Sequence, residues 1–549
     1  MTAPLRSARL RPAAADPWSL GALAIAAAVL APLVAVLWIA FQPTENIWPH
    51  LLATTLPRYL ENTLVLMVSV GLLTAVVGTV CAWLVVMYRF PGRAWLEWAL
   101  LLPLGVPAYV GAYALVDVLQ YAGPVQGALR ALFGWTSARD YWFPEIRSRW
   151  VAALVLSAAL YPYVYLLARN AFRDQAGSRF DVARALGAGP FARFWRVGLP
   201  LARPAIATGA AIAMMETVSD FGTVAYFGVQ TLTTGIFSVW LESYNAGGAA
   251  QIALVILGLV LVLLGLERAS RRKLRFHGST RGQHPLRPET LAGWRGRAAC
   301  AVCLVPFLAG LVLPVSVIGW HAAQNSRGWL DEALFAALAN TLLAGGAAAV
   351  ICVAAGLFMV YGVRLTGQAL PRRLLPVTTL GYAAPGAVLG IGILIPLAAF
   401  DHMLADAWAA LTGHDPGLIL TGSAAALVIA WVVRFFAIAQ GAVDAAMGRI
   451  APSLPMAARA LGQSPRGTLM RVHLPLIRGS IATALLLVFV DCVKELPATL
   501  LLRPFNFNTL ATRTYEQASL ERIAEAAPAA LMVTLMGLAA VLLLARTNR

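Results

Sequence analysis

Four carboxylic side chains lie inside long apolar stretches of this 549-residue chain, at matching places. Glu216 and Asp220 form one pair, Asp491 and Glu495 form the other, and both members of the second pair follow their counterparts at the same offset along the chain. A spacing of four puts both members of a pair on one face of a helix. Ionisable groups at such places usually face a partner or an aqueous path, and carboxylate oxygens suit a hard cation. The four residues are therefore candidates for the wall of a cation route.

A structural role is the competing interpretation of these carboxylates. Lys494 can neutralise a neighbour, and the hydroxyls of Thr217 and Ser219 or backbone groups can satisfy others. No firm metal site follows from the sequence. The His-Glu-x-x-His and Gly-x-Ser-x-Gly patterns are absent and the seven histidines are scattered, which argues against a membrane-embedded enzyme. We expect no catalytic residue and no cofactor in this chain.

The elements that must hold these side chains are membrane helices. The chain is 60% hydrophobic and only 12% charged, its mean hydropathy is +0.73, and its apolar residues run in blocks of the roughly 20 residues that cross a bilayer. We expect an all-α integral membrane fold with twelve spans. Their expected ranges are Leu20–Phe41, Asn62–Tyr88, Leu96–Leu119, Val151–Leu167, Ala205–Gly222, Ala249–Leu266, Ala299–His321, Asn340–Tyr361, Leu374–Ala399, Leu418–Ile438, Ser480–Leu501 and Ala527–Ala545.

Lys and Arg residues are distributed unevenly between the alternating loops. Nine of the 42 fall in one set of loops and Lys494 lies within a span, whereas 32 fall at the termini or in the other set, counting Arg434 at the inner end of its span. The richer side is cytoplasmic, so both termini are expected there. The net charge of +17 is spread over these inner loops, which argues against a nucleic-acid partner.

The chain reads as two related halves. A basic stretch at 267–298 divides the spans six and six, into a first half at 1–266 and a second at 299–549. The Asn-Thr-Leu that begins at Asn62 returns at Asn340, at nearly the same offset as the carboxylates. Internal duplication of this kind is typical of transporters with a central path.

Each half also has an inner loop with the same helix-ending and helix-starting residues. In each loop a helix-forming run ends at a glycine, and a Leu-Pro precedes the next span, which ends one helix and begins another. A helix across the cytoplasmic surface is available to a partner. The residues that carry the pattern are Asp181, Ala183, Gly187, Leu199 and Pro200 in one loop and Met456, Ala458, Gly462, Leu474 and Pro475 in the other.

This pattern resembles the EAA loop of ABC importer permeases, which reads Glu-Ala-Ala, three residues, Gly, nine residues, Ile, any residue and Leu-Pro. The resemblance implies a fused permease whose first coupling loop (181–200) and second coupling loop (456–475) dock on a dimer of ABC ATPase subunits. Because Asp181 keeps the negative charge and Met456 does not, an ion pair at that position would exist on one side only. The departures from the pattern are Asp181, Val182, Val197, Met456 and Val472.

The stretches ETVSDFGTVAYFGVQTLTTGIF, from Glu216, and KELPATLLLRPFNFNTLATRTYE, from Lys494, are similar to segments of ferric-iron ABC permeases. The resemblance implies a multi-pass subunit of a bacterial inner membrane that receives ferric iron from a periplasmic binding protein. A phosphate-binding loop needs Gly-Lys-Ser/Thr, and neither Lys273 nor Lys494 has that context. ATP hydrolysis is therefore expected from a separate subunit.

Other transporters share parts of this description. Fused permeases for thiamine, phosphonate or polyamines have the same architecture, so they stay open as alternatives for the cargo. A secondary transporter of the major facilitator type also has six plus six spans and a basic central loop. It usually carries a Gly/Asp/Arg-rich loop after its second span, where this chain has YRFPGRAW, and it leaves the two coupling loops without a role.

Overall fold

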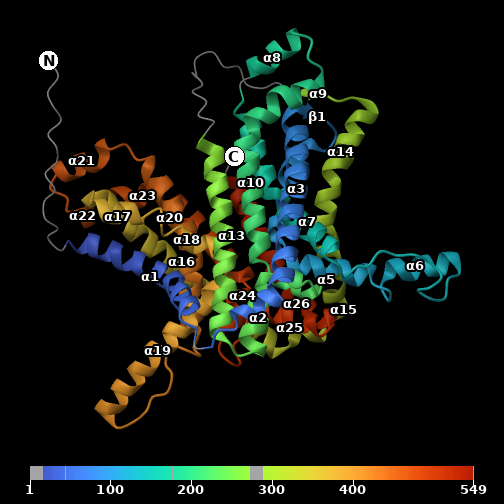
Figure 1. Cartoon of the computed structure of the whole chain (residues 1–549). Coiled ribbons are helices and arrows are strands. Elements are labelled where there is room, and N and C mark those ends of the chain that lie inside the picture. Colours follow the sequence, from blue (N-terminus) through green and yellow to red (C-terminus); the bar gives the residue numbers. More distant parts are fainter. Residues whose placement is uncertain (1–15, 44, 176, 273–287, 548–549) are drawn as a thin grey trace, which may run out of the picture.

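The structure is a computed structural model that describes residues 16–43, 45–175, 177–272 and 288–547, and in these nearly all regular structure is helical (Figure 1). Eleven described helices are long and apolar enough to cross a membrane, and a strongly bent pair raises the number to as many as twelve. Helices satisfy their own backbone hydrogen bonds, which an apolar bilayer requires. The expected all-α membrane fold is confirmed. Within the basic linker, residues 273–287 lie outside the described residues.

Long helices supply the spans and short ones connect them. The long helices are α1 (Pro17–Phe41), α3 (Leu56–Met87), α7 (Arg149–Arg173), α10 (Leu199–Ser219), α13 (Ala246–Arg272), α14 (Gly293–Phe307), α15 (Leu313–Gln324), α16 (Glu332–Thr366), α19 (Gly386–Thr412), α20 (Ala424–Gly448), α23 (Leu474–Lys494) and α26 (Ile523–Thr547). The short helices are α2 (Trp48–Ala53), α4 (Arg93–Ala99), α5 (Ala108–Leu119), α6 (Pro124–Phe133), α8 (Gly177–Ala185), α9 (Pro190–Arg193), α11 (Gly222–Tyr226), α12 (Leu232–Phe237), α17 (Ala369–Leu374), α18 (Leu380–Ala383), α21 (Ser453–Ala460), α22 (Pro465–Thr468), α24 (Pro497–Leu502) and α25 (Leu510–Ser519). Between them lie the 3₁₀ turns η1 (Leu102–Gly105) and η5 (Arg327–Leu330), the π-helical turns η2 (Phe194–Gly198), η3 (Ser238–Glu242), η4 (Leu308–Val312) and η6 (Leu469–His473), and the strands β1 (Tyr88–Arg89) and β2 (Glu289–Thr290).

The third expected span, Leu96–Leu119, is not one continuous helix. The chain passes through α4 and η1 and then turns by 94° into α5 and α6. Pro107 lies at this break, where its ring removes an N–H donor and disfavours helical backbone in the residue before it. The ninth expected span, Leu374–Ala399, begins late for the same reason, since α19 starts at Gly386 directly after Pro385. The two prolines have the same offset as the duplicated Asn-Thr-Leu segments, so both halves share the break.

The duplicated Asn-Thr-Leu segments make matching contacts in the two halves. The Thr63 hydroxyl accepts a hydrogen bond of 3.0 Å from the backbone N–H of Leu232, and the Thr341 hydroxyl accepts one of 2.9 Å from that of Leu510. Donors and acceptors share one offset along the sequence. These bonds attach α12 to α3 and α25 to α16 in the same way, as expected for two pseudo-symmetric halves.

Close packing within the first half depends on glycines that face α7. A Cβ atom at Gly78 of α3 would lie 2.8 Å from the backbone nitrogen of Tyr165, and one at Gly209 of α10 would lie 2.6 Å from the Cα of Val164. Small residues let membrane helices approach at backbone distance. The glycines therefore fix α3 and α10 against α7, and α10 carries Glu216 and leads directly into Asp220.

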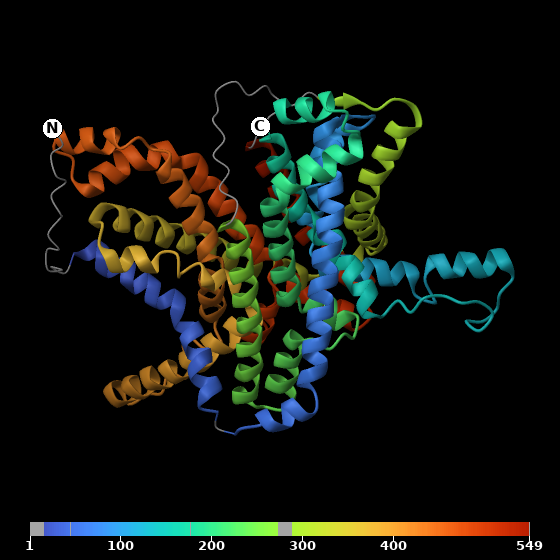
Figure 2. The same cartoon turned by 45° about the horizontal axis from the view of Figure 1, so that its top comes forward.

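The two halves exchange their first helices (Figures 1 and 2). α1 packs against α16 and α19 of the second half as well as α13 of the first, and α15 packs against α5 of the first half as well as α26 of the second. In both views α1, drawn in dark blue, lies among the yellow and orange helices of the second half. Each half is therefore completed by a helix from the other.

Candidate functional site

All four predicted carboxylates line one cavity of about 180 Å³ between the halves. Glu216 and Asp220 come from the end of α10, and Asp491 and Glu495 come from the end of α23. The two helix ends meet here because the halves are related by the duplication. Within the described residues, no group of three or more His, Cys, Asp or Glu side chains could hold a metal ion. The cavity is thus acidic without being a metal cage.

Asp220 and Glu495 do not lie on the helical faces that their spacing predicts. α10 and α23 end one residue earlier, and both residues have extended backbone, with ψ of 136° and 125°. The Asp220 carboxylate accepts hydrogen bonds from the backbone N–H groups of Thr223 (3.0 Å) and Val224 (3.1 Å). Glu495 accepts from the N–H groups three and four residues ahead, at 2.9 and 3.0 Å. The face prediction is wrong for these two, because each carboxylate caps the short helix that follows it.

Glu216 and Asp491 have carboxylates that are not used in caps. Glu216 accepts one hydrogen bond, of 3.1 Å, from the hydroxyl of Tyr382 in the second half. The Asp491 carboxylate accepts no side-chain or backbone hydrogen bond from the described residues. One acidic group from each half therefore faces the cavity with acceptor capacity to spare.

Two basic side chains share the cavity with the carboxylates. Arg434 of α20 lines it, and its Nε and Nη1 atoms are buried without a hydrogen-bond partner among the described residues. Lys494 donates to the backbone carbonyl of Leu104 at 2.6 Å, an acceptor in η1, where the broken span lacks α-helical bonding. The expected span boundaries place Arg434 at the inner end of a span, whereas it lies in the middle of α20 and reaches the cavity. The signal that could have found it is an arginine within an apolar stretch, the same argument that singled out the carboxylates.

A second hollow, of about 630 Å³, adjoins the cavity beside α12. Phe221 lines both spaces. Its ring stacks on Phe237 with 3.9 Å between centroids and lies 5.6 Å from the ring of Tyr515 in the second half. Aromatic rings from both halves therefore separate the hollow from the cavity.

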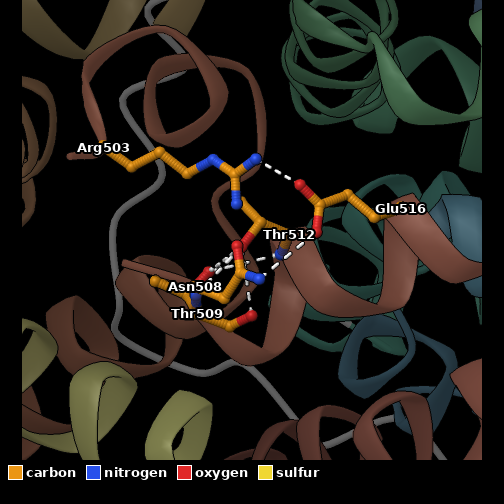
Figure 3. Close-up of polar contacts among 5 residues, drawn as sticks. All are labelled: Arg503, Asn508, Thr509, Thr512 and Glu516. Atoms are coloured by element: carbon orange, nitrogen blue, oxygen red, sulfur yellow. Dashed lines mark hydrogen bonds and ion pairs between the residues drawn. The ribbon is translucent and has the colours of Figure 1, made fainter. Parts of the chain in front are cut away.

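Polar contacts hold the second-half wall of this hollow (Figure 3). Arg503 forms an ion pair with one oxygen of Glu516, and Asn508 donates to the other at 3.3 Å. Thr509 and Thr512 exchange hydrogen bonds between side chain and backbone in a capping box at the start of α25. These contacts fix the start of α25 beside the hollow.

In both coupling loops the chain turns sharply at a glycine, Gly187 or Gly462, and we call this turn the elbow. Gly187 and Gly462 both have φ of +81°, a left-handed conformation that glycine adopts at little cost. The N–H of the residue after each glycine bonds to the carbonyl of Ala183 (2.9 Å) or Ala458 (3.0 Å), which closes the preceding helix in the same way in both copies. The glycines therefore shape the elbow where α8 and α21 end.

The other residues of the pattern fall at matching places. Leu199-Pro200 begins α10 and Leu474-Pro475 begins α23, each directly after a π-helical turn. Asp181 and Met456 are exposed. Figures 1 and 2 show α8 and α21 at the same end of the molecule but apart from each other, rather than side by side.

Exposed apolar side chains also repeat between the loops. Leu186 and Leu461, at equivalent positions of the duplication, are each 82% exposed, and Trp195 and Met470, which are also equivalent, are 51% and 63% exposed. Exposed apolar surface of this kind is typical of a face that another protein covers.

Comparison with known proteins finds similar chains among transport permeases. Residues 74–276 match the family described as binding-protein-dependent transport system inner membrane component. The chain is 26% identical over 481 residues to the Fe(3+)-transport system permease protein FbpB 2 of Haemophilus influenzae, which covers 87% of each protein. It is 28% identical over 267 residues to a probable sulfate transport system permease protein cysT of Nephroselmis olivacea (47% of this chain, 90% of that protein). It is 29% identical over 206 residues to the molybdenum transport system permease protein ModB of Escherichia coli K12 (36% and 86%). The resemblance to ABC importer permeases is thus confirmed: residues 74–276 match a domain of binding-protein-dependent transport systems, and these relatives are transport permeases.

Proposed function

We propose that this permease carries ferric iron through the cavity between its halves. The observation that carries the proposal is that Glu216 and Asp491, one from each half, face this cavity with carboxylates that no helix cap occupies. Carboxylate oxygen is a preferred ligand of hard cations. The similarity to an Fe(3+)-transport permease, which extends over 87% of both chains, supports the same cargo.

The lining of the cavity also supports weak binding of cargo, as a route needs. A path must bind its cargo well enough to admit it and weakly enough to release it. Two carboxylates without caps fall short of a complete ligand set, and the cationic groups of Arg434 and Lys494 lower the attraction for a further cation. Cargo is therefore expected to pause here rather than stay.

Partners are proposed for each end of this route. The matching elbows and the exposed Leu186 and Leu461 support docking of an ABC ATPase dimer, one subunit on each loop, and that dimer would hydrolyse ATP. The excess of Lys and Arg in the same set of loops supports a cytoplasmic position for this end and for both termini. The 630 Å³ hollow behind Phe221 supports delivery by a periplasmic binding protein on the other side.

An oxyanion is the second candidate cargo, and Arg434 is the observation that favours it. Its two buried N–H groups lack acceptors in the described structure, and relatives include sulfate and molybdenum permeases. The four carboxylates outnumber the two basic groups in the cavity wall, which repels an anion. Iron is therefore the first choice.

Uptake by intact cells tests the cargo. Cells that lack their own iron importers receive the permease with its ATPase and binding protein, and radioactive iron, sulfate, molybdate, thiamine, phosphonate and a polyamine are offered separately. We expect iron uptake alone to rise, and to fall in Glu216→Gln and Asp491→Asn but not in the loop control Asp140→Asn. Uptake of another compound in place of iron rejects the cargo, and iron uptake that survives both cavity replacements together rejects the route.

A further inference from the structure

The segment that joins the halves is attached to the first half at its far end. Glu289 and Thr290 form β2, which pairs in parallel with β1 at the end of α3. The backbone N–H of Leu291 donates to the carbonyl of Arg89 at 2.9 Å and extends the contact. The linker therefore reaches α14 only after it has been fastened beside α3.

The side chain of Glu289 contacts the first coupling loop. Its two oxygens accept hydrogen bonds from the two terminal nitrogens of Arg193, at 2.6 and 3.1 Å, and one also accepts from Arg184 at 3.3 Å. The Arg193 side chain is only 9% exposed. Bidentate, partly desolvated pairs of this kind are stronger and more directional than ordinary surface ion pairs. One linker carboxylate thus holds both sides of the first elbow.

Within the described part of the chain, the second coupling loop has no corresponding carboxylate that pairs with its basic residues. The counterpart of Arg184 is Arg459, and the counterpart of Arg193 is Thr468, which cannot form an ion pair. No described acidic side chain forms a salt bridge with Arg459. This loop is attached through a neutral bond instead, from the Tyr361 hydroxyl to the carbonyl of Pro465 at 2.6 Å.

We infer that Glu289 is a positioning residue that locks the first coupling loop to α3 through Arg193 and Arg184, so that the two loops respond unequally to the ATPase. The first loop moves with α3 as one body, whereas the second keeps more freedom at its elbow. The link to ATP hydrolysis rests on the proposed docking of an ATPase at the loops. The difference in how the two loops are attached does not depend on that docking.

Spin labels on the full-length permease alone test the fastening. Single cysteines are placed at Val182 and Ala457, exposed and equivalent positions of the two loops, in a background without native cysteines. We expect the label at 182 to be several-fold less mobile than the label at 457, and Glu289→Gln to release it without changing the other. The exchange of charges, Glu289→Arg with Arg193→Glu, should restrain it again. The control Asp444→Asn breaks an ion pair of 2.8 Å with Arg364, away from the linker, and should leave label 182 unchanged.

Equal mobility at both sites, or a label at 182 that ignores Glu289→Gln, overturns the inference. A second measurement then compares cargo moved per ATP hydrolysed in vesicles that contain the ATPase. We expect Glu289→Gln to lower this ratio several-fold and the charge exchange to restore it, unlike Asp444→Asn. If Glu289→Gln makes the label at 182 mobile but leaves the cargo moved per ATP unchanged, the unequal response to the ATPase is wrong, whereas the attachment of the first loop by Glu289 is supported. If no ATPase binds to the wild-type permease, the proposed docking fails instead.

Discussion

Tyr382 of the second half donates a hydrogen bond of 3.1 Å to Glu216 of the first half, across the central cavity. Because this is the one hydrogen bond that the Glu216 carboxylate accepts within the described residues, the hydroxyl orients it. We expect Tyr382→Phe to lower iron uptake several-fold, at a stability cost of no more than about 1.5–3 kcal/mol. Uptake per folded molecule is the measurement, with Tyr121→Phe on an outer loop as the control. Normal uptake by Tyr382→Phe would show that the carboxylate needs no orientation.

The cap carboxylates and the cavity carboxylates should give different phenotypes. Asp220→Ala removes the acceptor for two backbone N–H groups of α11 and should lower the free energy of unfolding by roughly 1 kcal/mol. Asp491→Asn removes no described hydrogen bond, so it should leave thermal stability unchanged and reduce uptake. Thermal unfolding of the purified variants, compared with uptake per folded molecule, separates the two effects. The distinction fails if Asp491→Asn is the less stable variant.

Replacement of the elbow glycines should be unfavourable because of their backbone conformation. A Cβ atom at Gly187 or Gly462 would meet nothing within 4 Å, so only the φ of +81° opposes replacement. We expect Gly187→Val to uncouple ATP hydrolysis from uptake, at a local cost on the order of 1–2 kcal/mol, and Gly187→Asn to be milder because Asn tolerates this conformation. Gly258→Val, at a helical glycine of α13 with equal space, is the control. Identical behaviour of the Val and Asn variants would contradict a conformational cause.

Acid should release the first coupling loop only. The hydrogen bond from Arg193 lowers the pKa of Glu289 below its usual value, and the other charged neighbour, Arg184, acts in the same direction. A carboxyl with a lowered pKa stabilises its contact above the unfolded pKa, about 4.3, and loses that contribution as pH falls through the folded pKa. The spin label at Val182 should therefore gain mobility only when the pH falls below the usual pKa of a Glu carboxyl, with no change at Ala457. In Glu289→Gln the pH dependence should disappear, and its persistence there would assign it to another group.

Much of the fold follows from the sequence because the length of an apolar block sets the length of a span. The breaks are less visible. Pro107 interrupts a block that is apolar on both sides, so hydropathy alone reads through it. Asp220 lies four residues after Glu216 in the chain, yet it leaves the helix to cap the next one, and such a change depends on where α11 begins. Arg434 stands out as an arginine within an apolar stretch, but the cavity that it lines depends on how α20 packs.

The exchange of first helices also sets an order of assembly during synthesis. α1 leaves the ribosome long before its neighbour α16, because α1 ends at Phe41 and α16 begins only at Glu332. At the usual rate of roughly 5–20 residues per second, synthesis of the chain between them takes about 15–60 s, and α1 waits that long for this neighbour. Until then α1 has only α13 of the first half, among the described helices, as a long neighbour already made, and it contains no charged residue over its whole length, which suits it to lipid. The helices of the second half that contact α1 are therefore made after it and must pack against a helix that is already present. The order of synthesis thus favours assembly of the second half around α1.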